Sequence, residues 1–330
     1  MSHFVSNPAE QVAPTAGAGR YAPSPSGALH LGNLRTAVIA ENFARRSGRS
    51  FLLRVDDLDP QRSRAEVARE QIADLARLGL QWDGEPEWQS DNHARYSAAL
   101  EHLSAEGRTF ECFCSRKDIL DAPRAPHAPP GAYPGTCRDL TAAERERRRA
   151  AMPSNKVPAI RVRADSGPPR GNGDSGVICR IHDVVQGEFS GVVDDFVLRR
   201  GDGAWAYNLA VVVDDAAAGV DQVVRGLDLL DSAPRQAWLA RQLGLAPVEY
   251  AHVPLAVAPG GARLAKRDGG HTLAELVAGG VAPEQVVTAI GESVGVPDAR
   301  SVQDIAARFE PALLAPGAEF GEPWVVPGEW

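Results

Sequence analysis

The chain has 330 residues, enough for about two domains of ordinary size, and 44% of them are apolar, so a sizeable core can form. The formal net charge of −8 argues against a strongly basic, non-specific nucleic-acid binder, although it does not exclude a basic face on one part of the surface. No run of about 18 apolar residues predicts a membrane span, residues 1–19 do not resemble a signal peptide, and four cysteines are too few for a disulfide framework. We therefore expect a cytoplasmic protein with no membrane partner.

The first third of the chain alternates strand and helix patterns. In order, the residues predict a short extended piece at 20–22, a helix over 31–47, a buried strand at 50–55, a helix to about Leu78 and an amphipathic helix to Gly107. Ser63 and Glu66 have the spacing of a capping box, which places the start of the second helix there. This alternation predicts an α/β fold with a parallel sheet covered by helices.

The middle of the chain has a different character. Residues 122–135 are rich in proline and predict a loop. The segments 157–164 and 177–183 alternate like strands, and Asp202-Gly203 is typical of a hairpin turn, so we expect an antiparallel insertion that splits the sheet domain. The helix and strand rhythm then returns, and the last 70 residues predict a short strand pair around 259–261 followed by helices.

Two glycine-bearing stretches carry residues suited to phosphate chemistry. RYAPSPSGALHLGNLRTA, residues 20–37, places a turn and His30 directly before a helix, whose N-terminal N–H groups and dipole attract phosphate. Read alone, it is equally compatible with an ordinary helix start and a partly buried histidine. AVAPGGARLAKRDGG, residues 256–270, carries Lys266 and Arg267 on a loop typical either of a clamp on polyphosphate or of a solvated hairpin.

Together these stretches resemble the class I aminoacyl-tRNA synthetases. His30-Leu31-Gly32-Asn33 resembles their HIGH signature, and Arg-Leu-Ala-Lys-Arg at 263–267 resembles their KMSKS loop. The glutamyl branch of the family is similar to FLLRVDDLDP at 51–60, AYNLAVVVDD at 206–215 and VVRGLDLLDS at 223–232. The resemblance runs from Arg20 to about Asp268 and implies a ligase that forms an aminoacyl-adenylate from ATP and an amino acid.

The resemblance also implies a Rossmann-type parallel sheet with a zinc-bearing insertion and a small helical C-terminal region. With the patterns above, it divides the chain into a mobile tail (1–19), the first half of the catalytic domain (20–108), the insertion (109–200), the second half of the catalytic domain (201–250), and the KMSKS-like loop with a short helical region (251–330).

The family motifs imply which residues meet ATP. His30, Gly32 and Asn33 correspond to positions that bind ATP, and Lys266 to the lysine that stabilises the departing pyrophosphate, so His30 and Lys266 are the candidate catalytic residues. Mg²⁺ is expected to accompany ATP. Ala265 replaces the usual serine of the loop, which predicts slower chemistry rather than none.

A glutamate substrate carries two carboxylates and one ammonium, so its pocket needs two arginines and an acid. The resemblance assigns the pocket to Arg20, Ser24, Asp56, Tyr207 and Arg225, with Arg225 facing the side-chain carboxylate. Asp56 stands where the family has glutamate and reaches about 1.5 Å less, so a water or a backbone shift must fill the gap. The alternative for the two arginines is a surface ion pair. We interpret the neighbouring acids as structural, capping helices or loops: Asp57, Asp59, Asp214 and Asp215.

Three cysteines near the proline-rich loop have the chemistry of a metal site. The resemblance implies a tetrahedral zinc site made of Cys112, Cys114, Tyr133 and Cys137. His127 is the competing fourth ligand, and a site without metal is the remaining alternative. Cys179 lies in a predicted strand and reads as a buried apolar residue.

The molecule that accepts the activated glutamate is predicted from the length of the chain rather than from a motif. Only about 60 residues follow Lys266, too few for the anticodon-binding domain of full glutamyl-tRNA synthetases, and Val211 stands where those have an asparagine. The chain thus resembles the shortened glutamyl-Q tRNA(Asp) synthetases, which implies transfer of glutamate to queuosine at the wobble position of tRNA(Asp), by a monomer. Charging of a tRNA 3′ end and a non-catalytic tRNA-binding role remain as alternatives. The arginines at 145 and 147–149 either contact RNA phosphates or form a solvated helix face.

Overall fold

A seven-stranded sheet forms the centre of the molecule. The computed structural model describes residues 17–121, 133–164, 177–262, 264, 271–328 and 330. The sheet has the order β3-β2-β1-β9-β10-β6-β7, and all neighbours are parallel except β6 and β7. Its strands are β1 (Ala18–Tyr21), β2 (Ser50–Val55), β3 (Glu87–Trp88), β6 (Val177–Asp183), β7 (Gly187–Val193), β9 (Val220–Gly226) and β10 (Glu249–Val253). The predicted parallel α/β sheet is confirmed.

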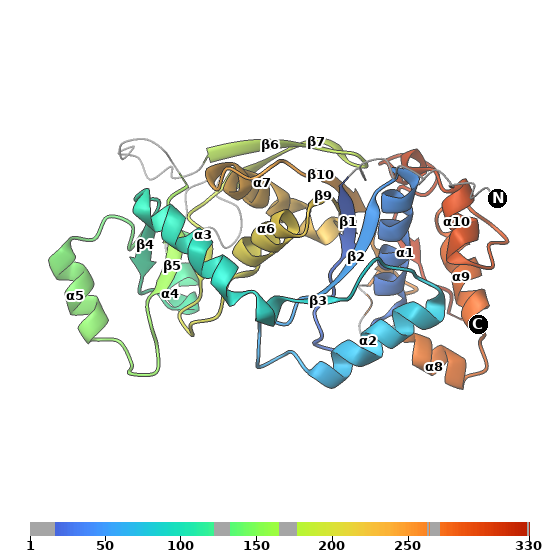
Figure 1. Ribbon diagram of the computed structural model, residues 1–330, viewed down its shortest axis with the longest axis horizontal. Coiled ribbons are helices and arrows are strands. Elements are labelled where there is room, and N and C mark those ends of the chain that lie inside the picture. The colour runs from blue at the N-terminus through green and yellow to red at the C-terminus, as the bar shows by residue number, and fades with distance from the viewer. Residues whose placement is uncertain (1–16, 122–132, 165–176, 263, 265–270, 329) are drawn as a thin grey trace, which may run out of the picture.

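Helices cover both faces of this sheet because its strands are apolar on both sides. Neighbouring residues of a strand point to opposite faces, so Val223 belongs to one core cluster and Val224 to the other. Helices α1 (Leu31–Arg46), α8 (Leu273–Ala278), α9 (Pro283–Glu292) and α10 (Val302–Arg308) lie on one side, and α6 (Tyr207–Ala217) and α7 (Ala233–Gln242) on the other (Figure 1). Helices α2 (Ala65–Leu78) and α3 (His93–Ala105) and the 3-10 turns η1 (Gln89–Asp91), η2 (Leu227–Ser232) and η3 (Pro311–Leu314) complete the connections.

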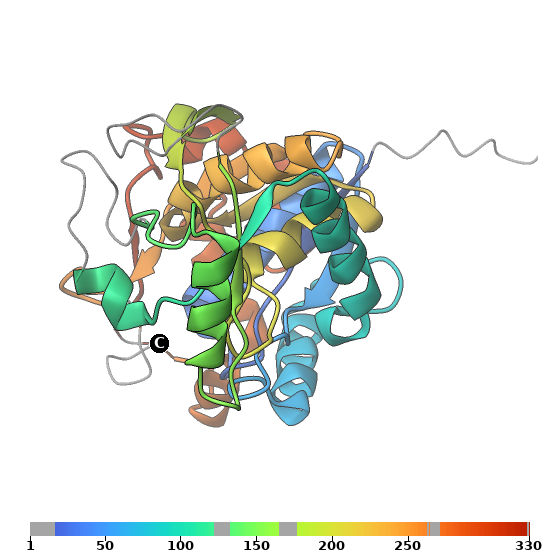
Figure 2. The same cartoon turned by 90° about the vertical axis from the view of Figure 1, so that its left-hand side faces the viewer.

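The sequence from 109 to 200 contributes to two different parts of the structure. Strands β4 (Thr109–Cys112), β5 (Ala159–Val162) and β8 (Val197–Arg199) form a separate antiparallel sheet, accompanied by α4 (Arg116–Asp121) and α5 (Ala142–Ala150). This part lies at the end of the molecule opposite α8–α10, and Figure 2 views the molecule from that end. The β6–β7 hairpin instead extends the main sheet, because β6 pairs with β10 and packs on α7.

The capping prediction for α2 is wrong. The helix has Arg64 rather than Ser63 at its N-cap, without a side-chain cap, and the Ser63 N–H that a capping box would pair with Glu66 donates to the Asp59 carbonyl at 2.8 Å. Of the strand pair expected around 259–261, the turn is present, with Gly260 and Gly261 both at positive φ, while residues 263 and 265–270 after it lie outside the described residues. The adjacent β11 (Ala256–Val257) pairs with β12 (Trp324–Val325), near the C-terminal end of the chain.

Within the part of the chain that the structure describes, no helix is both long and apolar enough to cross a membrane.

Candidate active site

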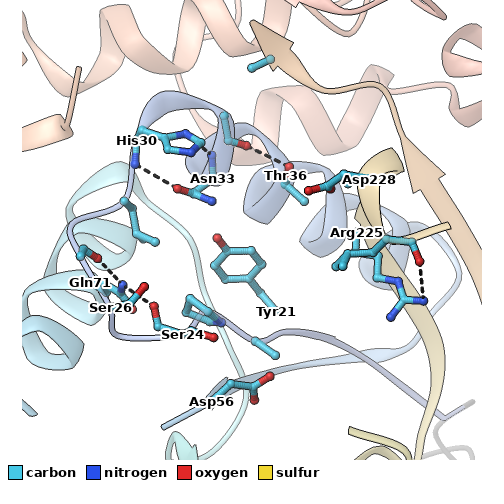
Figure 3. A pocket seen from close by; sticks show the side chains of 18 of the residues that line it. Tyr21, Ser24, Ser26, His30, Asn33, Thr36, Asp56, Gln71, Arg225 and Asp228 are labelled. Atoms are coloured by element: carbon cyan, nitrogen blue, oxygen red, sulfur yellow. Dashed lines mark hydrogen bonds between the residues drawn. The ribbon is translucent and has the colours of Figure 1, made fainter. Parts of the chain in front are cut away.

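A cavity of about 480 Å³ opens at the carboxyl ends of β1 and β9. The strand order runs outward in opposite directions from these two strands, and such a switch point is where open α/β sheets bind ligands. All eight described residues that were predicted to bind ATP or glutamate line it: Arg20, Ser24, His30, Gly32, Asn33, Asp56, Tyr207 and Arg225. Figure 3 labels Ser24, His30, Asn33, Asp56 and Arg225 among them. Lys266 lies outside the described residues, whereas Leu264 lines the cavity.

His30 is the N-cap of α1. Its Nδ1 accepts a hydrogen bond from the Asn33 N–H at 3.3 Å, and its own N–H donates to Asn33 Oδ1 at 3.1 Å. This reciprocal cap fixes the imidazole at the positive end of the helix dipole. A Cβ on Gly32 would lie 3.0 Å from Ala256 Cβ and 3.1 Å from the His30 ring, so glycine keeps the helix start open toward the cavity.

Arg20 and Asp56 line the cavity and belong to a buried network of two arginines and two aspartates. Arg20 donates to Asp215 through Nε at 3.1 Å and Nη2 at 3.3 Å, and Arg54 donates to Asp215 at 2.6 Å and to Asp56 at 2.8 Å. Burial disfavours the charge on Asp215, but Arg20 and Arg54 outweigh it and lower its pKa. At Asp56 burial prevails over the arginines and raises the pKa. A substrate ammonium beside Asp56 would supply the missing positive charge.

Arg225 is held on several sides and is 5% exposed. Its Nε donates to His252 Nε2 at 2.9 Å, and its Nη1 donates to Gln236 Oε1 at 2.7 Å and to the Tyr207 hydroxyl at 3.3 Å. Nη2 donates to the Leu229 carbonyl at 3.3 Å. The guanidinium therefore has a fixed orientation at the cavity wall, and the predicted alternative of a surface ion pair fits neither Arg20 nor Arg225, both of which are buried.

The four acids interpreted as structural contact the chain's own groups. Asp57 accepts from Ser90, and Asp59 from Gln61 and Arg200. Asp214 and Asp215, however, are buried partners of other side chains rather than caps; Asp214 accepts from the Tyr96 hydroxyl at 2.6 Å.

Several residues of the cavity were assigned no role from the sequence, although Tyr21, Thr36 and Asp228 lie within the stretches 20–37 and 223–232 that carry the resemblance. These three residues line the cavity, and Gln71 on α2 donates to the carbonyls of Ser24 and Gly27, which holds the loop after β1. Gln71 had a signal, since it is a polar residue on the apolar face of an amphipathic helix. Val211, in contrast, is buried in the core and does not line the cavity.

A second cluster lies at the end of β4, away from the cavity. The Sγ atoms of Cys112, Cys114 and Cys137 lie within 4.8 Å of one another and could hold a metal ion. The Tyr133 hydroxyl oxygen is 3.4 Å from Cys112 Sγ and 3.9 Å from Cys114 Sγ. A tetrahedral ion with S ligands at about 2.3 Å needs S–S separations of roughly 3.8 Å, and Cys114 and Cys137 lie 3.5 Å apart.

Positive charge surrounds this cluster, which favours thiolates. Arg148 donates to Cys137 Sγ at 3.5 Å, and the Arg161 guanidinium stacks 3.9 Å above the Tyr133 ring.

The competing ligand His127 lies outside the described residues, and Cys179 is buried in β6 as expected. Helix α5 has no buried residue, and Arg149 pairs with Glu111, so α5 presents a solvated face.

Comparison with known proteins identifies the family. The class I tRNA synthetase (E and Q) catalytic domain matches residues 18–305. A glutamyl-Q tRNA(Asp) synthetase of Nocardia farcinica is 53% identical over 319 residues, covering 96% of each chain. The chain belongs to this family. Another member, from Symbiobacterium thermophilum, is 45% identical over 85% of this chain and 87% of its own.

Solved structures agree on the fold. A glutamate-tRNA synthetase from Elizabethkingia anophelis superposes with a TM-score of 0.75 at 24% identity, over 92% of this chain and 67% of that one. A glutamate tRNA ligase from Elizabethkingia meningosepticum, in complex with its amino acid, gives 0.72 over 90% and 65%, so the chain spans about two thirds of its length. The predicted family, the fold class and the prediction of an aminoacyl-tRNA synthetase-like ligase are confirmed.

Proposed function

We propose that this chain activates L-glutamate with ATP and transfers the glutamyl group to queuosine at the wobble position of tRNA(Asp). The observation that carries the proposal is the convergence of the eight predicted residues on one cavity, in a chain 53% identical to a glutamyl-Q tRNA(Asp) synthetase. Charging of a tRNA 3′ end is the second candidate, because the solved structures of the same fold are glutamate-tRNA synthetases.

In the first step the α-carboxylate of glutamate attacks the α-phosphorus of ATP. A carboxylate O–P bond forms, the P–O bond to pyrophosphate breaks, and glutamyl-adenylate remains. His30 and Asn33 hold ATP phosphates at the N-terminus of α1, where the dipole and N–H groups favour anions. Lys266, two residues beyond the cavity-lining Leu264, stabilises the charge that moves to pyrophosphate. Mg²⁺ bound with ATP would neutralise part of the phosphate charge.

The substrate's three charged groups find complementary partners. Arg225 and Tyr207 receive the side-chain carboxylate, and Asp56 receives the ammonium. Arg20 and Ser24 lie on the same wall of the cavity near Asp56, and are assigned to the α-carboxylate. The chemistry then depends on alignment rather than on a protein nucleophile.

In the second step a hydroxyl of the acceptor attacks the activated carbonyl. The new ester C–O bond forms, the C–O bond to AMP breaks, and the hydroxyl proton leaves with solvent. Single-stranded anticodon bases can be splayed and read by a protein, which suits a wobble nucleoside as acceptor.

We assign a structural zinc ion to Cys112, Cys114, Cys137 and Tyr133. The three sulfurs and the phenolic oxygen lie at separations close to those of a tetrahedral site, and thiolates are the ligands that zinc prefers. The ion would fix the end of β4 to the segment around Cys137 and takes no part in the adenylation.

Two measurements test the function. ATP–pyrophosphate exchange that requires L-glutamate and no tRNA is expected; its absence would refute the mechanism and favour a non-catalytic role. Labelled glutamate should then pass to tRNA(Asp) that contains queuosine, including tRNA trimmed of its 3′ adenosine. Transfer that needs the 3′ adenosine and ignores queuosine would establish the second candidate instead.

A further inference from the structure

Three buried side chains from three neighbouring strands stand in line behind the cavity wall. Asp183 ends β6, His252 lies on β10, and Arg225 lies on β9. Asp183 Oδ2 is 2.5 Å from His252 Nδ1, and His252 Nε2 is 2.9 Å from Arg225 Nε. Asp183 and His252 are fully buried, and neither lines the cavity.

The hydrogen bonds determine which nitrogen of His252 carries the proton. Asp183 Oδ1 accepts from the backbone N–H groups of Val185, Gln186 and His252 at 2.9 to 3.1 Å, so the carboxylate is an acceptor throughout. Arg225 Nε can only donate. His252 must therefore donate from Nδ1 and accept at Nε2, which is the neutral imidazole. Burial lowers the pKa of His252, in agreement with a neutral ring.

The other side of the guanidinium is fixed in the same way. Gln236 accepts from Arg225 Nη1 and donates from Nε2 to Asn208 Oδ1 at 3.0 Å, so its amide cannot turn over without losing both bonds. The Tyr207 hydroxyl also accepts from Nη1. Its own hydrogen must then point elsewhere, and Tyr207 is 42% exposed at the cavity.

At Arg225 and Tyr207 this arrangement leaves hydrogen-bond donors for a ligand. Among the described residues four of the five Arg225 N–H groups have partners, which leaves one on Nη2. A carboxylate has two acceptor oxygens for that N–H and for the Tyr207 hydroxyl. A carboxamide offers one acceptor and one NH₂ donor, which would face another donor. Sites that leave a buried polar group mispaired discriminate strongly.

We propose that Asp183 and His252 are positioning residues that hold Arg225 in this orientation and so select glutamate over glutamine. The inference rests on the proposed function, in which Arg225 receives the side-chain carboxylate. Neither residue touches the substrate. Their effect passes through the tautomer of His252, which keeps an acceptor rather than an N–H against Arg225 Nε.

Substitutions at the two positions separate this role from simple packing. In Asp183→Asn the new NH₂ faces Nδ1, the imidazole adopts its other tautomer, and an N–H faces Arg225 Nε. His252→Asn still reaches Asp183 but not Arg225, whereas His252→Gln places its side-chain oxygen near the position of Nε2. We expect Asp183→Asn and His252→Asn to raise the KM for glutamate at least tenfold and to lower the preference for glutamate over glutamine, with a smaller change in kcat. His252→Gln should stay within about threefold of the native chain.

The double variant Asp183→Asn/His252→Gln has no tautomer to switch, so it should resemble His252→Gln rather than Asp183→Asn. Far-UV circular dichroism and an unchanged KM for ATP check that each variant is folded. Folded Asp183→Asn and His252→Asn variants with native KM and native selectivity would overturn the proposal.

Glutamate binding by calorimetry separates this inference from the proposed function. If the native chain binds glutamate but shows no exchange, the proposed function fails, and the binding constants of the variants still decide the role of Asp183 and His252. If the native chain binds no glutamate, both fail.

Discussion

Glu41 on α1 predicts a large dependence of stability on pH. The residue is 4% exposed. Its Oε1 accepts from the Gln81 N–H at 3.2 Å, and its Oε2 has no hydrogen-bond partner among the described residues. Burial raises the pKa of Glu41 from 4.5 to about 7, only partly offset by Gln81 and Arg45. The folded chain therefore binds this proton more tightly than the unfolded chain.

The shift from 4.5 to about 7 corresponds to about 3 kcal/mol, since one pKa unit is worth about 1.36 kcal/mol. Because the folded pKa is raised, this contribution to the free energy of unfolding is fully present below pH 4.5 and is lost as pH rises through 7. Glu41→Gln removes the charge at every pH and retains the oxygen that accepts from Gln81. At pH 8 the variant should be more stable by about 1–3 kcal/mol, the lower figure applying if its new NH₂ finds no partner.

Urea unfolding of both chains between pH 4.5 and 8.5 measures this difference. The two chains differ only at residue 41, so the difference between them reports on Glu41. Glu70→Gln, at an exposed position of α2, is the matched control for replacing a helical glutamate by glutamine. A Glu41→Gln variant whose advantage is constant with pH, or which is less stable than the native chain at pH 8, would refute the reasoning.

Three further predictions concern the cavity and the cysteine cluster. Asp215→Asn removes the negative charge that pairs with Arg20 and Arg54, so it should lower the free energy of unfolding by about 3–5 kcal/mol, measured by urea unfolding. A loss under about 1 kcal/mol would contradict the stabilising role of this buried network. Lys266→Ala should slow ATP–pyrophosphate exchange about 100-fold without weakening glutamate binding by calorimetry, and equal losses in both would contradict its role. Elemental analysis should find about one zinc per chain, lost in Cys112→Ser but retained in Cys179→Ser; less than half an equivalent in the native chain would rule the ion out.

Much of the site could be predicted because its residues belong to short motifs with local geometry. His30, Gly32 and Asn33 adjoin a helix start that the sequence pattern already places at residue 31. The network behind them could not be predicted in this way. Arg20 and Asp215 are separated by 195 residues, and their contact depends on how β1 and α6 lie beside each other in the fold. A local pattern contains no such information.

The β6–β7 hairpin shows the same limit. An alternating strand pattern fits an inserted sheet and the edge of the main sheet equally well, and only the pairing of β6 with β10 decides between them. One signal was available in the sequence. Cys179, Ile181 and Asp183 share the buried face of the strand, so an aspartate stands in phase with apolar residues. A buried carboxylate needs partners, and His252 and the neighbouring N–H groups supply them.

The two arginines of the cavity differ in how their charges are balanced. Arg20 is paired with Asp215, so together with Arg54 and Asp56 it forms a network with no net charge when all four groups are ionised. Arg225 donates only to neutral groups among the described residues, and the carboxylate nearest along its hydrogen-bond chain, Asp183, is separated from it by the whole imidazole of His252. A buried cation without a carboxylate partner is unfavourable until an anion arrives. Because the described hydrogen-bond partners of Arg225 are all neutral, this position favours a substrate with a side-chain carboxylate over a neutral analogue.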